Sequence, residues 1–292
     1  MSASGDLRTG KGHRDENFPV ASWLIGKQHR PAIHAFYEFV RVADDVADHP
    51  SLHGSEKLAR LDRLEQSLLG GSDAEPEGVM LRHIFAERKL PAQHARDLLQ
   101  AFRQDVVKGR YSDFGELLDY CALSAMPVGR FVLDVHGESR ATWPASDALC
   151  AALQIINHLQ DCAKDYRTLD RVYLPLDDLA SHGLGVECLA EERSSKALRV
   201  CLRELAVRTE RLLELSQGLA ASVADTRLAL EISVIQSLAA RLVRRLQARD
   251  PLSERVHLNK AEMTVTAFSA SSRALLRRLF RAAVPRHRYQ TP

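Results

Sequence analysis

Two clusters of carboxylates in the sequence are spaced so that each could hold a metal ion from one face of a helix. The segment Pro31–Asp48 reads PAIHAFYEFVRVADDVAD and carries Asp44 and Asp48 four residues apart. The segment Asp147–Tyr166 reads DALCAALQIINHLQDCAKDY. Its polar residues are spaced three, four and four residues apart, which places them on one stripe of a helix; they are Gln154, Asn157, Asp161 and Asp165. Carboxylate and amide oxygens in such rows could bind Mg²⁺ together with the phosphates of a substrate.

The first cluster belongs to a helix whose apolar residues cover more than half of its circumference, which predicts a mostly buried helix. Asp44 falls on the apolar side, Asp48 lies near its edge, and Arg41 borders both. Carboxylates at this spacing repel each other by about 0.2–0.5 kcal/mol even when exposed. A divalent cation would remove this repulsion and the larger cost of burial. In the alternative interpretation the helix end is exposed, Asp45 and Asp48 are solvated, and Arg41 pairs with Asp44.

The second cluster also has a structural alternative. An apolar face lies opposite the polar stripe, as in any amphipathic surface helix, and consists of Leu149, Ala152, Ile156, Leu159 and Ala163. Neither cluster is decisive alone. A D-x-x-x-D pattern on each of two helices nevertheless favours a shared metal site between facing helices, where helical bundles commonly place such sites.

The elements that must position these residues are predicted to be helices. The chain has only 15 glycines and 11 prolines, against roughly 35 together at average usage. Apolar residues recur at steps of three and four, and the alternation typical of strands is nearly absent. No internal repeat or linker is found, so one all-α domain is expected. Helix breaks are predicted at His49–Gly54, Gly70–Gly78, Lys89–Pro91, Gly109–Asp113, Gly137–Asp147 and Pro175–Gly185.

Composition and cysteine usage indicate the location of the protein and the classes of partner it is expected to have. Hydrophobic residues make up 45% of the 292 residues, enough for a sizeable core, and the net charge of +2 argues against a nucleic-acid partner. The odd number of cysteines, five, and the absence of C-x-x-C suggest neither a zinc site nor disulfides and fit a cytoplasmic location. No segment resembles a signal peptide or a membrane span. We expect a flexible N-terminus (1–16), one domain (17–284) and a short tail (285–292).

The segment Ala261–Val284 predicts a basic amphipathic helix. Such helices often lie on anionic membranes, which would allow peripheral contact with the inner face of the membrane. The alternative is a last helix that packs on the core with a solvated basic face. Its apolar residues include Met263, Phe268, Leu275, Leu276, Leu279 and Phe280, and they alternate with Arg273, Arg277, Arg278 and Arg281.

Both carboxylate clusters resemble the two aspartate signatures of the squalene and phytoene synthases. Three further segments are similar to that family in the expected order: YCALSAMPVG at 120–129, RVYLP at 171–175, and Arg255-Val256 followed by Lys260. The segment ENFPVAS at 16–22 most resembles the bacterial branch of hydroxysqualene synthases, which serve hopanoid biosynthesis.

The resemblance implies a terpenoid synthase-type helical bundle around a central apolar cavity. That branch converts presqualene diphosphate and water to hydroxysqualene and diphosphate, with Mg²⁺ and without NADPH. The implied metal ligands are Asp44, Asp45, Asp48, Asn157, Asp161 and Asp165. The implied substrate-binding residues are Phe18, Ser22, Tyr37, Arg41, Gln154, Asn157, Arg171 and Arg255, and Tyr120 joins the four motif aspartates Asp44, Asp48, Asp161 and Asp165 as catalytic.

The sequence also departs from the family. Many members carry arginine where this chain has Gln160 and glutamate where it has Lys164, which leaves the number of metal ions open. Some members also place a tyrosine near Leu238, and this chain has none there. The alternative within the family is head-to-head prenyl transfer that gives presqualene diphosphate or phytoene. An alternative of another class is a non-catalytic scaffold on the same fold, against which the retention of all four motif aspartates argues.

Overall fold

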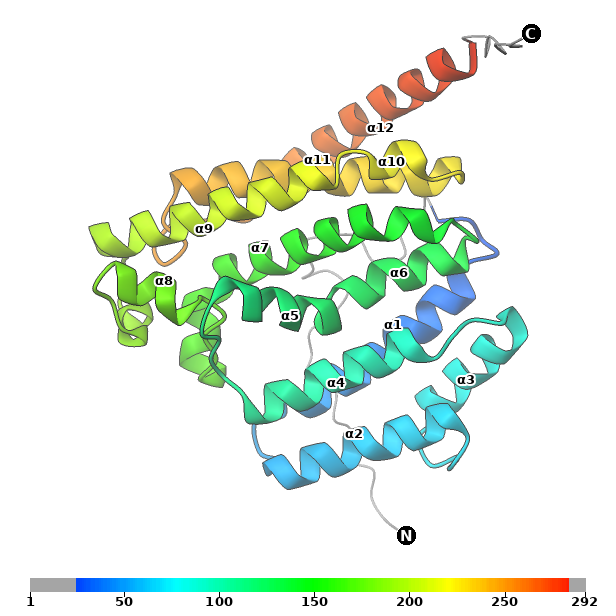
Figure 1. Cartoon of the computed structure of the whole chain (residues 1–292), viewed down its shortest axis with the longest axis horizontal. Coiled ribbons are helices and arrows are strands. Elements are labelled where there is room, and N and C mark those ends of the chain that lie inside the picture. The colour runs from blue at the N-terminus through cyan, green and yellow to red at the C-terminus, as the bar shows by residue number, and fades with distance from the viewer. Residues whose placement is uncertain (1–24, 284–292) are drawn as a thin grey trace, which may run out of the picture.

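The computed structural model describes residues 25–283, which fold into layers of helices with no β-strand in that range. One layer holds the first four helices, a second layer holds the next three, and a third covers the second from the other side (Figure 1). The layers are α1 (Arg30–Ala47), α2 (Gly54–Leu69), α3 (Pro76–Arg88) and α4 (Gln93–Val107); α5 (Phe114–Ser124), α6 (Met126–Val135) and α7 (Trp143–Leu169); and α9 (Lys196–Leu215), α10 (Leu219–Ser222), α11 (Thr226–Ala248) and α12 (Lys260–Ala283). The all-α prediction is confirmed.

Helix α7 lies at the centre of the bundle, between α5 and α6 on one side and α9 and α11 on the other (Figure 1). Its buried side chains are not confined to one face. They include Ser146, His158 and Gln160 as well as the expected apolar residues. The alternative of an amphipathic surface helix is therefore wrong for the second aspartate cluster, because neighbours cover most of the circumference of α7.

Helix α1 is mostly buried, as predicted, and Pro31 occupies its first turn, where a missing N–H costs nothing. Ala32, Phe36 and Phe39 pack into a core shared with α2, α3 and α4. Asp45 is also buried, with 6% of its surface exposed. The alternative in which Asp45 is solvated is therefore wrong.

Most predicted helix breaks are confirmed, and two are misplaced. Gly70 ends α2 in the left-handed conformation at φ 86°, which glycine adopts without strain. Helix α7 begins at Trp143, earlier than the predicted boundary at Asp147, because Pro144 stands in its first turn. The short helix α8 (Leu176–Ser181) occupies part of the predicted break Pro175–Gly185. An unpredicted break at Ala125 separates α5 from α6.

All five cysteines are free thiols, as expected from their number and spacing. Across residues 25–283 no helix combines the length and apolarity needed to cross a bilayer. The domain limits 17–284 and the flexible N-terminus remain predictions.

Candidate active site

An apolar cavity of about 350 Å³ lies between α1, α6, α7 and α11. Phe36 of α1 forms part of its wall and stacks on Phe131 of α6, with ring centroids 3.9 Å apart. Glu231, only 4% exposed, adds a carboxyl group to this otherwise largely apolar wall. The lining residues of three helices are Ile33, Phe36, Tyr37 and Val40 of α1; Ser146, Leu149, Cys150 and Leu153 of α7; and Leu228, Glu231, Ile232 and Ile235 of α11.

A polar groove of about 800 Å³ lies at the other end of α1 and α7. Its charged residues are mostly basic, which suits a phosphorylated ligand. They are Asp48, Lys57, Asp105, Lys108, Arg110, Arg167, Asp170 and Arg171.

The predicted metal-binding residues lie between these two hollows on both helices. Along α1, the apolar lining ends at Val40, Asp44 follows one turn later, and Asp48 opens onto the groove. Along α7, the apolar lining ends at Leu153, and the stripe from Gln154 to Asp165 leads to the groove residues that begin at Arg167. Along both helices, the aspartates therefore lie between the residues that line the apolar cavity and those that line the polar groove.

Each of two acids near the end of α1 has a cationic partner. Arg41 Nε lies 3.5 Å from Asp45 Oδ2, one turn away on the same helix, and Arg41 also donates to the hydroxyl of Tyr37. Arg41 thus pairs with Asp45, a partner that the sequence analysis did not name. Arg171 Nη1 donates to Asp48 Oδ1 over 2.6 Å.

Arg171 reaches Asp48 because two loops pair with each other. Val172 N–H donates to the carbonyl of Gly109 over 2.8 Å, which joins the loop after α4 to the loop after α7. A Cβ atom at position 109 would lie 2.9 Å from the carbonyl oxygen of Asp170, so glycine permits this close approach. The pairing holds the buried Arg171 against the end of α1.

The charge of Asp165 on α7 is less well compensated. Burial, followed by the charge of Asp161, raises the pKa of Asp165 to about 7. Asp48 raises it further, and Lys164 and Arg171 oppose the shift. Asp48, Asp161 and Asp165 therefore share one electrostatic environment although they come from two helices. The imidazole of His257 approaches Asp161 Oδ1 at 3.9 Å from the loop before α12.

Asp105 of α4 is a component of this region that the sequence did not reveal. It accepts hydrogen bonds from the hydroxyl groups of Tyr120 over 2.8 Å and Tyr173 over 3.1 Å. Burial raises its pKa to about 6, and the charge of Arg171 partly opposes that shift. No spacing rule connects a residue of α4 with tyrosines of α5 and of the loop after α7, so only the fold could bring them together.

Some predicted site residues lie elsewhere or outside the described part of the chain. Tyr120 is buried against Tyr111, Tyr173 and His158, with its hydroxyl on Asp105, and not on the wall of the apolar cavity. The side chain of Arg255 is exposed in the loop before α12. Phe18 and Ser22 fall outside residues 25–283.

The donor set between the hollows fits Mg²⁺ by its chemistry. It consists of carboxylates with an amide from Asn157, and hard oxygen ligands are those that Mg²⁺ prefers. Burial and the charge of Asp161 disfavour the ionised form of Asp165, and a bound cation would favour that form. Within the described residues, a different group brings three ligand atoms within 4.8 Å of one another: His29, His136 and Asp225. Imidazole ligands do not suit Mg²⁺, so this group is not the predicted centre.

Comparison with known proteins identifies the family of the chain. The family model of squalene/phytoene synthases matches residues 12–262. The hydroxysqualene synthase of Rhodopseudomonas palustris is 60% identical over 280 residues, 96% of both chains. That of Sinorhizobium fredii is 51% identical over 280 residues, again 96% of both chains.

Solved structures give the same fold. A squalene synthase HpnC from Alicyclobacillus acidocaldarius superposes with a TM-score of 0.68 at 30% identity, covering 78% of this chain and 88% of that one. A dehydrosqualene synthase solved with a ligand superposes with a TM-score of 0.75, covering 87% of this chain and 89% of that one, and its 21% identity speaks for the fold alone. The chain belongs to the squalene/phytoene synthase family.

Proposed function

We propose that this member of the squalene/phytoene synthase family is a hydroxysqualene synthase, which converts presqualene diphosphate and water to hydroxysqualene and diphosphate. The observation that carries the proposal is the identity of 50–60% with three hydroxysqualene synthases over more than nine tenths of this chain. An apolar cavity, a row of aspartates and a largely basic groove follow one another along α1 and α7, and this order supports the proposal because the substrate joins a long hydrocarbon to a diphosphate.

The metal centre is part of this proposal. Asp44, Asp48, Asp161 and Asp165 would hold Mg²⁺, with contributions from Asp45 and Asn157. When bound, the ion supplies Lewis-acid stabilisation of the diphosphate leaving group. The ion pair of Asp45 with Arg41 favours a supporting role for Asp45, whose carboxylate is already engaged.

The basic residues of the groove bind and orient the leaving group. Arg171 is fixed by Asp48 and by the loop pairing at Gly109, so its guanidinium is preorganised for phosphate oxygens. Lys57 lies at the same end, where its ammonium donates to the carbonyl of Ala47 over 2.8 Å. Burial and the nearby charge of Arg171 lower the pKa of Lys57, and added negative charge would favour its charged form.

The carbon–oxygen bond breaks heterolytically, and the diphosphate leaves with the electron pair. Water then adds its oxygen to the carbocation derived from the substrate and loses a proton, so that the alcohol forms without any change in redox state. Tyr37 and Phe36 face the cavity, and aromatic faces stabilise a nearby cation by about 0.5–2 kcal/mol. No nicotinamide cofactor is required by this balance. We place the reaction in the cytoplasm, in keeping with five free thiols.

The test is a product analysis with purified protein, presqualene diphosphate and Mg²⁺ in ¹⁸O-labelled water. Hydroxysqualene that carries the label, with or without NADPH, is the expected product. Squalene that forms only with NADPH, or consumption of farnesyl diphosphate to cyclopropyl or phytoene-like products, would show another activity of the family. Binding of neither Mg²⁺ nor diphosphate would favour a non-catalytic scaffold.

A further inference from the structure

Helix α12 carries apolar side chains on two opposite sides. The inner side packs on α11 through Met263, Ala267 and Ala270, which meet Val234, Leu238 and Leu258. The outer side exposes four large apolar side chains, which we call the α12 stripe. They are Val265 (63% exposed), Phe268 (77%), Leu275 (45%) and Leu276 (53%).

The α12 stripe differs from the other exposed apolar residues of the described chain. The remaining six are spread over five helices, whereas these four follow one another at helical spacing along one side of α12. Single exposed apolar residues need no explanation, but a contiguous row marks a surface that contacts something apolar.

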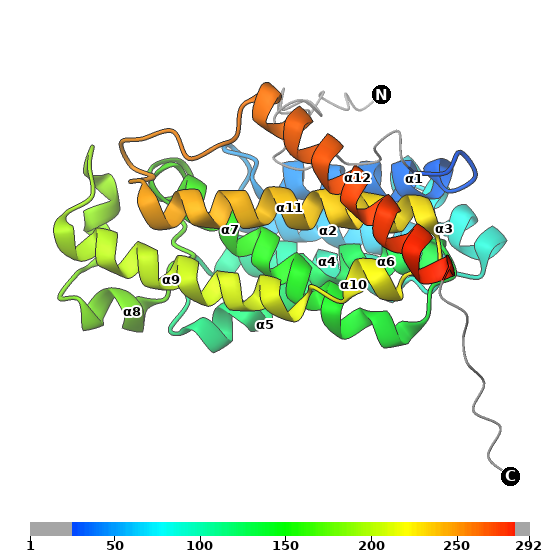
Figure 2. The ribbon, with the colours of Figure 1, turned by 90° about the horizontal axis from the view of Figure 1, so that it is seen from above.

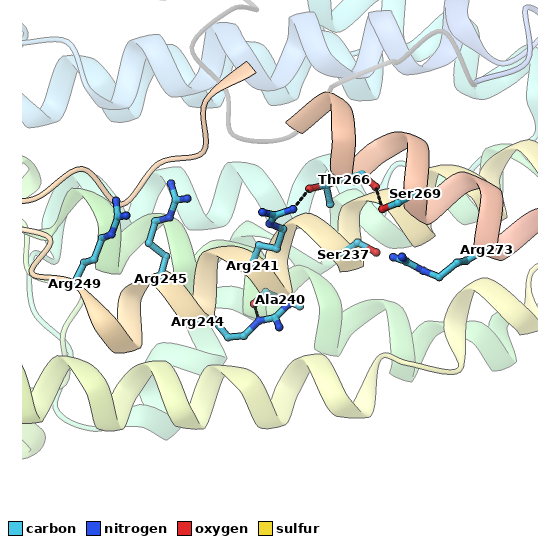
Figure 3. A pocket seen from close by; sticks show the side chains of 9 residues that line it. All are labelled: Ser237, Ala240, Arg241, Arg244, Arg245, Arg249, Thr266, Ser269 and Arg273. Atoms are coloured by element: carbon cyan, nitrogen blue, oxygen red, sulfur yellow. Dashed lines mark hydrogen bonds between the residues drawn. The ribbon is translucent and has the colours of Figure 1, made fainter. Parts of the chain in front are cut away.

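A strongly basic groove runs beside the stripe, between α11 and α12. Five of its nine lining residues are arginines and none is acidic, and its volume is about 680 Å³. Figure 3 shows Arg241, Arg245 and Arg249 following one another along α11, while Arg273 of α12 reaches toward Ser237. Glu262 pairs with Arg245, and Arg241 donates to the hydroxyl of Thr266 over 2.8 Å, so the guanidinium groups of this groove exceed the carboxylates bound to them.

The groove and the stripe are neighbouring rows of the same helix. Thr266, Ser269 and Arg273 line the groove at steps of three and four residues. On an α-helix this row lies between the inner side of α12 and the stripe. Viewed from above, α12 crosses α11 at the surface of the bundle, so both rows are presented from the outermost helix (Figure 2).

We propose that the α12 stripe and the arginine groove form one docking surface for an anionic lipid bilayer. The stripe would enter the boundary between head groups and acyl chains, and the arginines would contact lipid phosphates. Charge complementarity favours this occupant over a neutral apolar partner. An apolar row beside a groove with more guanidinium groups than carboxylates suits a bilayer surface, whose interior is apolar and whose head groups are anionic. One consequence rests on the proposed function: the surface places the enzyme beside the membrane, which would take up a water-insoluble C30 alcohol.

Co-sedimentation with vesicles tests the proposal on the full chain. Vesicles of phosphatidylcholine mixed with phosphatidylglycerol should bind the protein at low salt, and vesicles of phosphatidylcholine alone should bind it far less. The double substitution Phe268→Ser with Leu276→Ser, and the double substitution Arg244→Gln with Arg273→Gln, should each weaken binding by about tenfold or more.

Matched controls remove the same groups from other exposed positions. Leu69→Ser with Leu215→Ser removes two apolar side chains that are 55% and 70% exposed. Arg203→Gln with Arg211→Gln removes two exposed arginines of α9. Both controls should bind vesicles like the wild type. The proposal fails if controls and test variants lose binding equally, or if neutral vesicles bind as well as anionic ones.

Two other possible occupants of this surface, a second copy of the chain and a soluble anion, predict different results. A wild-type dimer in solution that Phe268→Ser dissociates would assign the stripe to a second copy of the chain. Binding of inorganic diphosphate that Arg244→Gln with Arg273→Gln abolishes, without any vesicle binding, would assign the groove to soluble anions. Either result overturns the membrane surface. Turnover of presqualene diphosphate in detergent should stay unchanged in all four variants, and its absence from the wild type would contradict the proposed function while leaving the vesicle result intact.

Discussion

The two aspartate-bearing helices place their acids in contrasting electrostatic environments. At the end of α1, Asp45 and Asp48 each lie beside an arginine, at 3.5 Å and 2.6 Å. On α7, burial and the charge of Asp161 raise the pKa of Asp165 to about 7. Two carboxylates at the end of α1 therefore have cationic partners in the protein, whereas the carboxyl group of Asp165 on α7 lies in surroundings that disfavour its charge.

This difference shows what each helix depends on. The α1 acids are held by protein cations and gain less from a bound metal ion. On α7, burial and the neighbouring charge of Asp161 disfavour the ionised form of Asp165, and a cation bound between the helices would favour that form. Ionised Asp165 is therefore a part of the site that costs free energy while no metal ion is bound.

The largest effect is expected for catalysis. Asp44→Asn and Asp161→Asn should each lower kcat by about a thousandfold or more, because each removes a ligand charge that stabilises the leaving group. Helical content by circular dichroism should remain near that of the wild type. Appreciable turnover in either variant would rule out a metal centre shared by both helices, and unfolding of both would indicate a structural role instead.

The next effect is on stability at the α1 end. Arg171→Met removes the partner of Asp48 from a nearly buried ion pair and should lower the free energy of unfolding by about 3 kcal/mol. Arg203→Met, at an exposed position of α9, serves as the control and should change it by less than about 0.5 kcal/mol. Denaturant titration of both variants measures the difference. Equal stability would mean that α1 does not depend on this pair.

The sequence predicted the helices and the two aspartate stripes well because both rest on local spacing. The buried character of α1 followed from its apolar circumference, and Arg171 was named as a candidate site residue through the resemblance. The central position of α7 was left open, since a helix with one strong apolar face looks the same whether or not its polar face is later covered. Asp105, Lys57 and Glu231 were missed because their importance arises only from contacts between segments distant in the chain.

A smaller effect of opposite sign is expected on α7. Asp165→Asn removes a carboxylate that is costly to ionise, so it should stabilise the metal-free protein at pH 8 by about 2 kcal/mol. The same change should abolish the gain in melting temperature that the wild type shows with Mg²⁺ and diphosphate. Thermal unfolding with EDTA and with both ligands measures both effects. A metal-free Asp165→Asn protein less stable than the wild type would show that the charge on α7 is already balanced.

The smallest effect tests the buried carboxyl group that supports the site from α4. The pKa of Asp105 is raised from 3.8 to about 6, so the folded protein binds more protons than the unfolded chain between these values. The stability contributed by this group is therefore present at low pH and is lost as pH rises from about 4 to about 6, with little change above.

Asp105→Asn keeps an oxygen acceptor for Tyr120 but cannot ionise. We expect the wild type to lose about 1–2 kcal/mol relative to this variant across that range, measured as the difference between their free energies of unfolding at each pH. Because both proteins share all other titrating groups, the difference isolates Asp105. A constant difference from pH 4 to pH 7 would mean that Arg171 and the two tyrosine hydroxyls already offset the cost of burial, and the contrast between balanced and unbalanced acids would then be confined to α7.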